Sequence, residues 1–143
     1  MKQAFSLLEI IIVLIVVSIL ASFIVFKASN SISSTIKMKV KSDIALIRSS
    51  IQKINSKKIL LGESFLDELD KEQTNNQTNE LFSYILDFPL KGSTKNIKKH
   101  GEWIKNSSND YLVYINDNTF LKYSYKNNSF ICKSDETLCK EFE

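Results

Sequence analysis

A single carboxylate interrupts an apolar run near the start of the chain. Glu9 is the only charged residue between Phe5 and Phe26. A charged side chain within such a run is costly in hydrocarbon, so it marks a functional site and needs a partner. If the chain is cut between Ala4 and Phe5, the new amino group of Phe5 lies one helical turn from Glu9 and is cationic at neutral pH. We therefore expect this amine and this carboxylate to neutralise each other, within one chain or between neighbouring chains.

Two cysteines near the C-terminus form a second candidate group. Cys132 and Cys139 enclose six residues, which is too long for a redox-active CxxC pair, and two sulfurs are too few for a four-ligand zinc site. We expect a disulfide, which requires an oxidising compartment such as the periplasm and would stabilise the fold by about 2.5 kcal/mol. Two reduced, buried thiols are the alternative.

A group of lysines around one tryptophan forms a third candidate. Positive charges beside an aromatic ring are typical of surfaces that follow a nucleic-acid backbone, so DNA is a candidate partner. The alternative is a solvated loop, because lysine is abundant along the whole chain. The residues concerned are Lys95, Lys98, Lys99, Trp103 and Lys105.

The remaining polar residues argue against an enzyme. His100 is the only histidine, and it follows two lysines in a stretch that we expect to be a solvated turn. A nucleophilic site that needs a histidine would have to use this one. No glycine-rich phosphate loop and no metal motif occurs in the sequence. We therefore expect no catalytic residues, no bound metal and no cofactor.

The apolar run that contains Glu9 is long enough to be a membrane segment. Residues 10–26 carry no charge, and a helix of about 20 apolar residues spans the hydrocarbon layer. We predict a transmembrane helix over residues 5–26. A cleaved secretory signal is one rival, although its apolar core should be shorter and should end in small residues. An uncleaved signal anchor is the stronger rival, and Glu9 argues against it.

An amphipathic helix is predicted to continue over residues 27–58. Apolar residues recur there at intervals of three or four, which places them on one face. We expect this face to pack on a sheet rather than in a coiled coil, since no heptad repeat persists. The lysines after Phe26 would favour a cytoplasmic C-terminal part, whereas the cysteines favour an extracytoplasmic one. The apolar stripe consists of Ile32, Ile36, Val40, Ile44, Ile47, Ile51 and Ile54.

Residues 59–143 are expected to form an α+β head. From Trp103 onward, apolar and polar residues alternate between Asn- and Asp-rich turns, which predicts three or four antiparallel strands. Ser64–Lys71 and Leu81–Leu86 are predicted to be short helices. A helix laid across such a sheet would bury the isoleucine stripe.

The first residues carry a family resemblance. Lys2-Gln3-Ala4 before Phe5-Ser6-Leu7-Leu8-Glu9, followed by an unbroken apolar run, resembles the class III leader and methylation motif of type IV pilins and type II secretion pseudopilins. The resemblance implies that a prepilin peptidase removes residues 1–4 and that Phe5 becomes the N-methylated first residue. It also implies that Glu9 recruits and registers subunits. Ala4 stands where the family usually has glycine.

The resemblance also implies an architecture and a set of partners. The fold would be pilin-like, with a long N-terminal helix packed on a small antiparallel sheet and a disulfide that fixes the C-terminal segment to the last strand. The precursor would lie in the inner membrane with a periplasmic head and would later join a periplasmic or surface filament. Its partners would be the prepilin peptidase, other pilin or pseudopilin subunits and the inner-membrane assembly platform. Major secretion pseudopilins more often use a calcium-bound loop, so the cysteine pair favours a pilus or DNA-uptake subunit.

Two functions remain open at this point. The first is a minor pilin or pseudopilin of a filament that serves DNA uptake or protein secretion. The second is a single-pass anchored periplasmic module that binds a partner and does not polymerise. Glu9 distinguishes them, because a plain anchor would tolerate an apolar residue at this position.

Overall fold

The structure, a computed structural model, describes residues 7–143, although not the side chains of residues 23–33. It divides into two compact units, Met1–Thr35 and Ile36–Glu143, which we call the N-terminal unit and the head unit. Helices and one six-stranded sheet make up the chain, and the predicted α+β class is confirmed.

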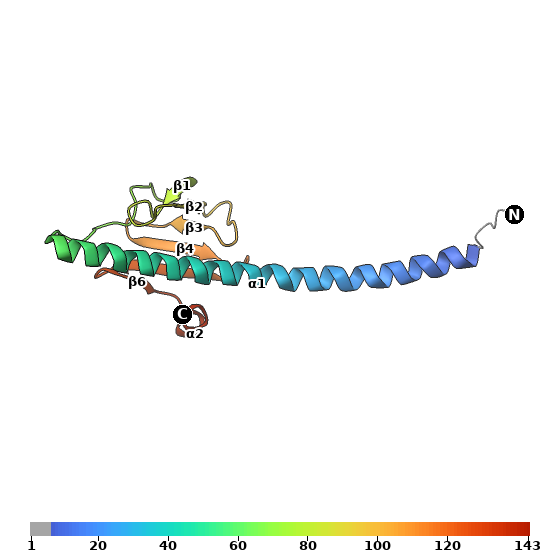
Figure 1. Cartoon of the computed structure of the whole chain (residues 1–143). Coiled ribbons are helices and arrows are strands. Elements are labelled where there is room, and N and C mark those ends of the chain that lie inside the picture. The colour runs from blue at the N-terminus through green and yellow to red at the C-terminus, as the bar shows by residue number, and fades with distance from the viewer. Residues whose placement is uncertain (1–6) are drawn as a thin grey trace. The chain divides into compact units, whose positions relative to one another are not determined.

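Helix α1 begins at Leu7 and ends at Leu61, so both units contain part of it (Figure 1). In the N-terminal unit its side chains from residue 7 to residue 22 are exposed. Within the described residues, no helical stretch is both long and apolar enough to cross a lipid bilayer. The predicted segment 5–26 includes residues outside this described set, and its membrane location stays a prediction.

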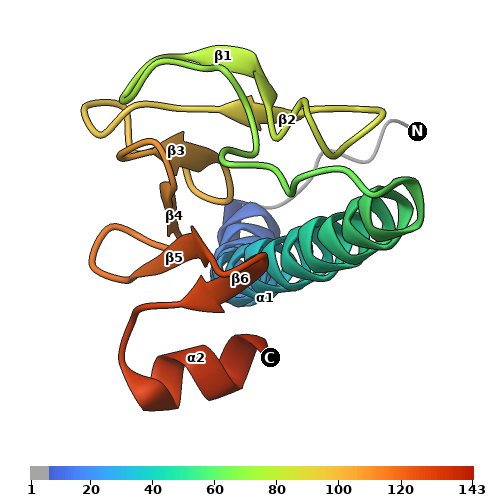
Figure 2. The same ribbon diagram turned by 90° about the vertical axis from the view of Figure 1, so that its left-hand side faces the viewer.

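The head unit contains a sheet whose six strands follow one another in chain order (Figure 2). Strands β3 to β6 form the predicted antiparallel meander. The prediction of a purely antiparallel sheet is wrong, because β2 and β3 are parallel neighbours, with Gly92 opposite Trp103. The strands are β1 (Thr78–Leu81), β2 (Leu90–Gly92), β3 (Trp103–Lys105), β4 (Asp110–Tyr114), β5 (Phe120–Lys126) and β6 (Ser129–Cys132).

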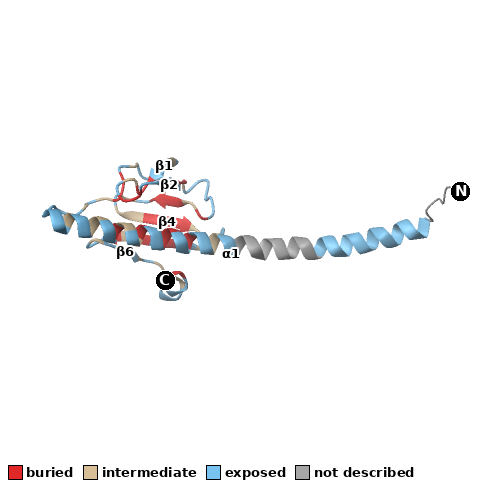
Figure 3. Cartoon of the chain, in the orientation of Figure 1, coloured by how far each residue is buried: buried red, intermediate tan, exposed pale blue. Residues whose placement is uncertain are grey.

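The core of the head lies between α1 and one face of this sheet, and buried turns of α1 run beside the buried strand β4 in Figure 3. The predicted stripe packs there from Ile36 to Ile54, both of which are partly buried, whereas the side chain of Ile32 lies outside the described ones. Aromatic rings line the sheet side of the core, and five of them contact one another, with neighbouring centroids as close as 4.5 Å. The buried stripe residues are Val40, Ile44, Ile47 and Ile51, and the rings are those of Phe82, Trp103, Tyr111, Tyr123 and Phe130.

The two short helices predicted after α1 are wrong. Residues 64–71 form no helix, and residues 82–85 form a turn that follows β1. The Asp70 carboxylate accepts hydrogen bonds from the backbone N–H groups of Glu72 and Phe82, each at 3.1 Å. Such side-chain bonds compete with helical ones. The second helix is instead α2 (Glu136–Phe142), which the sequence analysis did not predict.

The packing of the stripe gives a matched test. Ile44 is 2 % exposed, whereas Ile59 on the same helix is 66 % exposed. We expect Ile44→Ala to lower the free energy of unfolding by about 2–5 kcal/mol, because it removes buried methyl groups and leaves a cavity. Ile59→Ala should change it by less than about 0.5 kcal/mol. Urea denaturation of the full-length chain in non-ionic detergent measures both values, and equal values would contradict the observed packing.

Candidate functional site

The N-terminal unit presents one carboxylate on an apolar helical surface. The large apolar side chains from Leu7 to Leu20 are each about half exposed or more. The hydroxyl of Ser18 donates to the carbonyl of Ile15 at 2.8 Å, and Ser22 donates to the carbonyl of Ser18 at 2.9 Å. Both hydroxyl groups are therefore satisfied by the helix itself.

Glu9 differs from these serines. It is exposed, and among the described residues it has no hydrogen-bond or ion-pair partner. The predicted cleavage residues Ala4 and Phe5 lie outside the described residues, so the expected amine partner stays a prediction. Within the described residues, the Glu9 carboxylate is therefore not neutralised, and it lies on a mostly apolar surface.

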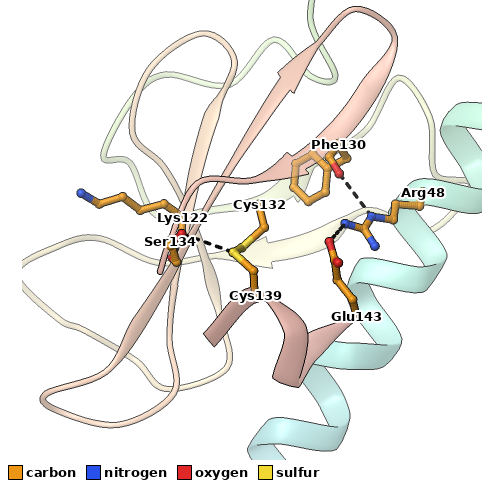
Figure 4. Close-up of a disulfide and its surroundings, with 7 residues drawn as sticks. All are labelled: Arg48, Lys122, Phe130, Cys132, Ser134, Cys139 and Glu143. Atoms are coloured by element: carbon orange, nitrogen blue, oxygen red, sulfur yellow. Dashed lines mark hydrogen bonds and ion pairs between the residues drawn. A yellow bond between two sulfur atoms is a disulfide. The ribbon is translucent and has the colours of Figure 1, made fainter. Parts of the chain in front are cut away.

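The predicted disulfide is confirmed at the C-terminus of the head unit (Figure 4). Cys132 ends strand β6 and Cys139 lies in α2, with sulfurs 2.04 Å apart and Cα atoms 5.9 Å apart. The covalent bond therefore ties the last helix to the edge strand of the sheet.

Helix α2 is also fixed to α1 by contacts beyond the disulfide. Phe142 is buried in the core. Arg48 of α1 donates to the carboxylate of Glu143 at 3.0 Å and to the carbonyl of Phe130 at 3.2 Å, as Figure 4 shows. Lys37 pairs with Glu141 at 2.6 Å. A helix of seven residues is not stable alone in water, so these contacts and the disulfide together hold it in place.

A buried polar centre lies around Asp70. Its carboxylate oxygens accept from the Lys105 amine at 2.9 Å and from the Tyr111 hydroxyl at 2.8 Å. Burial raises the pKa of Tyr111 far above its usual range, and the neighbouring Asp70 charge adds to this rise. The phenol therefore stays protonated and donates to the carboxylate. Since every partner belongs to the protein, the centre serves the fold and offers no open site.

The predicted DNA-binding patch is not present as one surface. Trp103 is fully buried, and its indole N–H donates to Asp43 of α1 at 3.1 Å. Lys105 is buried in the Asp70 centre. Both side chains point to the helix-covered face of the sheet, where no nucleic acid can reach them. This part of the prediction is wrong.

The other three residues of the predicted patch stay exposed. Lys99 pairs with Glu102 at 2.6 Å, whereas Lys95 and Lys98 have no ion-pair partner in the described part of the chain. The amine of Lys98 lies 5.7 Å from the ring centroid of Tyr114.

Two aromatic residues on the outer face of the sheet were not predicted from the sequence. Tyr114 and Phe120 are cross-strand partners in β4 and β5, and their ring centroids lie 5.5 Å apart. A signal for them was present, because side chains alternate between the faces of a strand. Once Tyr111 and Val113 face the core, Tyr114 must face outward.

No metal or cofactor site emerges from the described residues. Among them, no group of three His, Cys, Asp or Glu side chains is arranged to hold a metal ion. His100 contacts Asp117 at 3.0 Å on the surface.

Comparison with protein-family models, with curated proteins and with solved structures finds no match to this chain. What the chain does must therefore be inferred from its own residues.

The disulfide-tied helix gives a second prediction. We expect the double substitution Cys132→Ser/Cys139→Ser to lower the free energy of unfolding by about 2.5 kcal/mol, because the unfolded chain loses a covalent constraint. Amide hydrogen exchange should rise first in α2, since its docking then depends on noncovalent contacts alone.

A matched variant is Lys140→Ala, which removes an exposed pair of α2 with Glu136 and should change stability by less than about 1 kcal/mol. If α2 keeps its protection without the disulfide, the bond is not what holds the helix.

Proposed function

We propose that the chain is a filament subunit of the type IV pilin and type II secretion pseudopilin class, acting as a minor pilin or pseudopilin. One observation carries the proposal: Glu9 is a lone carboxylate, without a partner among the described residues, on a helix surface that is mostly apolar and exposed. Neither a soluble head nor a plain lipid anchor needs such a residue.

The apolar surface itself needs a cover. A helix that is apolar on all sides is stable in lipid or among other apolar helices, but not in water. In the proposed cycle, the inner membrane covers residues 5–26 of the precursor, and neighbouring subunits cover them in the filament. In the membrane and in the filament, the Glu9 carboxylate is stable only if its charge is neutralised.

The partner of Glu9 is the amino group that processing would create. Removal of residues 1–4 by a prepilin peptidase leaves a cationic amine on Phe5. When a new subunit enters the filament, its amine pairs with the Glu9 carboxylate of a neighbour. Because an unpaired charge in hydrocarbon is costly, this pairing fixes the axial register of the incoming subunit.

The head supports an extracytoplasmic location. A disulfide forms and persists in oxidising compartments such as the periplasm. The filament would extend and retract through an inner-membrane platform and a cytoplasmic assembly ATPase. It would serve DNA uptake or protein secretion, and the cysteine pair favours a pilus or DNA-uptake system over a secretion one.

The test is filament incorporation of Glu9→Leu. We expect this variant to insert into the membrane at least as well as the parent chain and to be absent from sheared filaments, because it lacks the registering charge. Ser18→Leu is the matched control, since it also replaces a polar residue of the apolar segment by leucine but removes only a hydroxyl bonded to its own helix. Normal incorporation of Glu9→Leu would contradict the proposal and favour the anchored, non-polymerising module.

Intact-mass analysis of the membrane-extracted protein tests the processing step. We expect a mass that lacks residues 1–4 and carries one added methyl group on Phe5. A full-length, unmethylated chain would mean that Ala4 prevents cleavage or that the motif is fortuitous, and in both cases the amine that the assembly step requires would be missing.

A further inference from the structure

Four side chains stand in a row on the outer face of the head sheet. The amine of Lys98 lies 5.7 Å from the ring centroid of Tyr114, the two rings are 5.5 Å apart, and the amine of Lys122 lies 5.4 Å from the ring centroid of Phe120. We call Lys98, Tyr114, Phe120 and Lys122 the aromatic–lysine cluster. It combines two rings with two positive charges outside the core of the head.

The strand register fixes this arrangement. Tyr114 pairs with Phe120 across β4 and β5, on the face opposite the buried side chains of Tyr111 and Val113. Phe120 is 37 % exposed, and Tyr114 is half-buried. Because both rings stand on hydrogen-bonded strands, they are held on a rigid platform and lose little freedom when a ligand binds.

The charge of the cluster is not neutralised within the protein. Neither Lys98 nor Lys122 has a carboxylate partner in the described chain, unlike Lys99 and Lys105. A further cation is near in the sheet, since the backbone N–H of Lys133 donates to the carbonyl of Lys122. The acid in the β4–β5 turn, Asp117, contacts His100. The cluster therefore suits an anionic ligand.

The backbone at Lys98 is also unusual. Its φ angle is +47°, in the left-handed region that residues other than glycine rarely occupy. Its N–H donates to the carbonyl of Thr94 at 3.0 Å, so the turn holds this conformation. The amine of Lys98 lies over the Tyr114 ring, 5.7 Å from its centroid.

We infer that the aromatic–lysine cluster binds single-stranded nucleic acid. Proteins that bind single strands without sequence preference combine cationic side chains for the phosphates with aromatic rings on which bases stack. An acidic peptide would use the lysines but gain little from the rings. The inference does not depend on filament assembly, and it shares only Lys98 with the surface predicted from the sequence.

The experiment measures fluorescence anisotropy of a labelled oligothymidylate with the full-length chain in non-ionic detergent. Phe120→Leu removes the ring but keeps an apolar side chain, and we expect it to weaken binding by about tenfold. Lys98→Gln/Lys122→Gln should weaken binding and lower the slope of log affinity against log salt by about 1.4, because two phosphate contacts are lost.

Matched controls carry the same chemical changes elsewhere in the head. Phe88→Leu alters a ring that is 88 % exposed and outside the cluster, and Lys53→Gln/Lys57→Gln removes two exposed charges of α1. Both should bind like the parent chain. Phe120→Trp should retain binding, which shows that a ring is needed at this position rather than phenylalanine itself.

Three results would overturn the inference. The first is no saturable binding of oligothymidylate by the parent chain. The second is equal weakening by the cluster variants and by their controls, which would indicate general charge attraction. The third is binding of polyglutamate or duplex DNA that matches oligothymidylate and is insensitive to Phe120→Leu, which would assign the lysines to another polyanion. Incorporation into filaments is measured in a separate experiment. Its result does not affect how these three binding outcomes are interpreted.

Discussion

The head depends on the burial of one face of α1 against an aromatic sheet. Isoleucine and valine side chains supply the helix side of this contact, and aromatic rings and aliphatic side chains supply the other. Apolar packing alone does not strongly favour one position of α1 along the sheet. A polar contact fixes this position. The buried indole N–H of Trp103 reaches the Asp43 carboxylate, which also accepts from Lys39 at 2.8 Å. Since a buried donor without a partner is costly, sliding the helix along the sheet would break this link.

A second polar link holds the segment between α1 and the sheet. The Asp70 carboxylate accepts hydrogen bonds from its own loop, from β3 and from β4. One carboxylate therefore joins three parts of the chain. The same carboxylate accepts from the N–H of Phe82, whose φ angle of +64° is strained for a bulky residue. Burial of the Phe82 ring among Trp103 and Tyr111 offsets this strain.

Much of this fold follows from periodicity, and the rest depends on contacts that periodicity does not encode. The spacing of Ile44, Ile47 and Ile51 predicted the buried helix face, and alternation predicted strands β3 to β6. The Asp70 centre escaped prediction because an acidic, polar segment resembles a solvated one until its distant partners are known. Trp103 was wrongly predicted to lie on the surface for a related reason, because lysines surround it in the sequence. Side chains alternate between the two faces of β3, and this alternation directs the Trp103 ring into the core.

The order of the head's elements along the chain affects how the protein folds during its synthesis. The rings that cover the α1 stripe follow it in the chain, from Phe82 to Phe142, so they leave the ribosome after the stripe. Until that part emerges, the stripe has no cover, and loop closure over such sequence distances is slow. A nascent chain therefore exposes an aggregation-prone helix face until those rings have emerged.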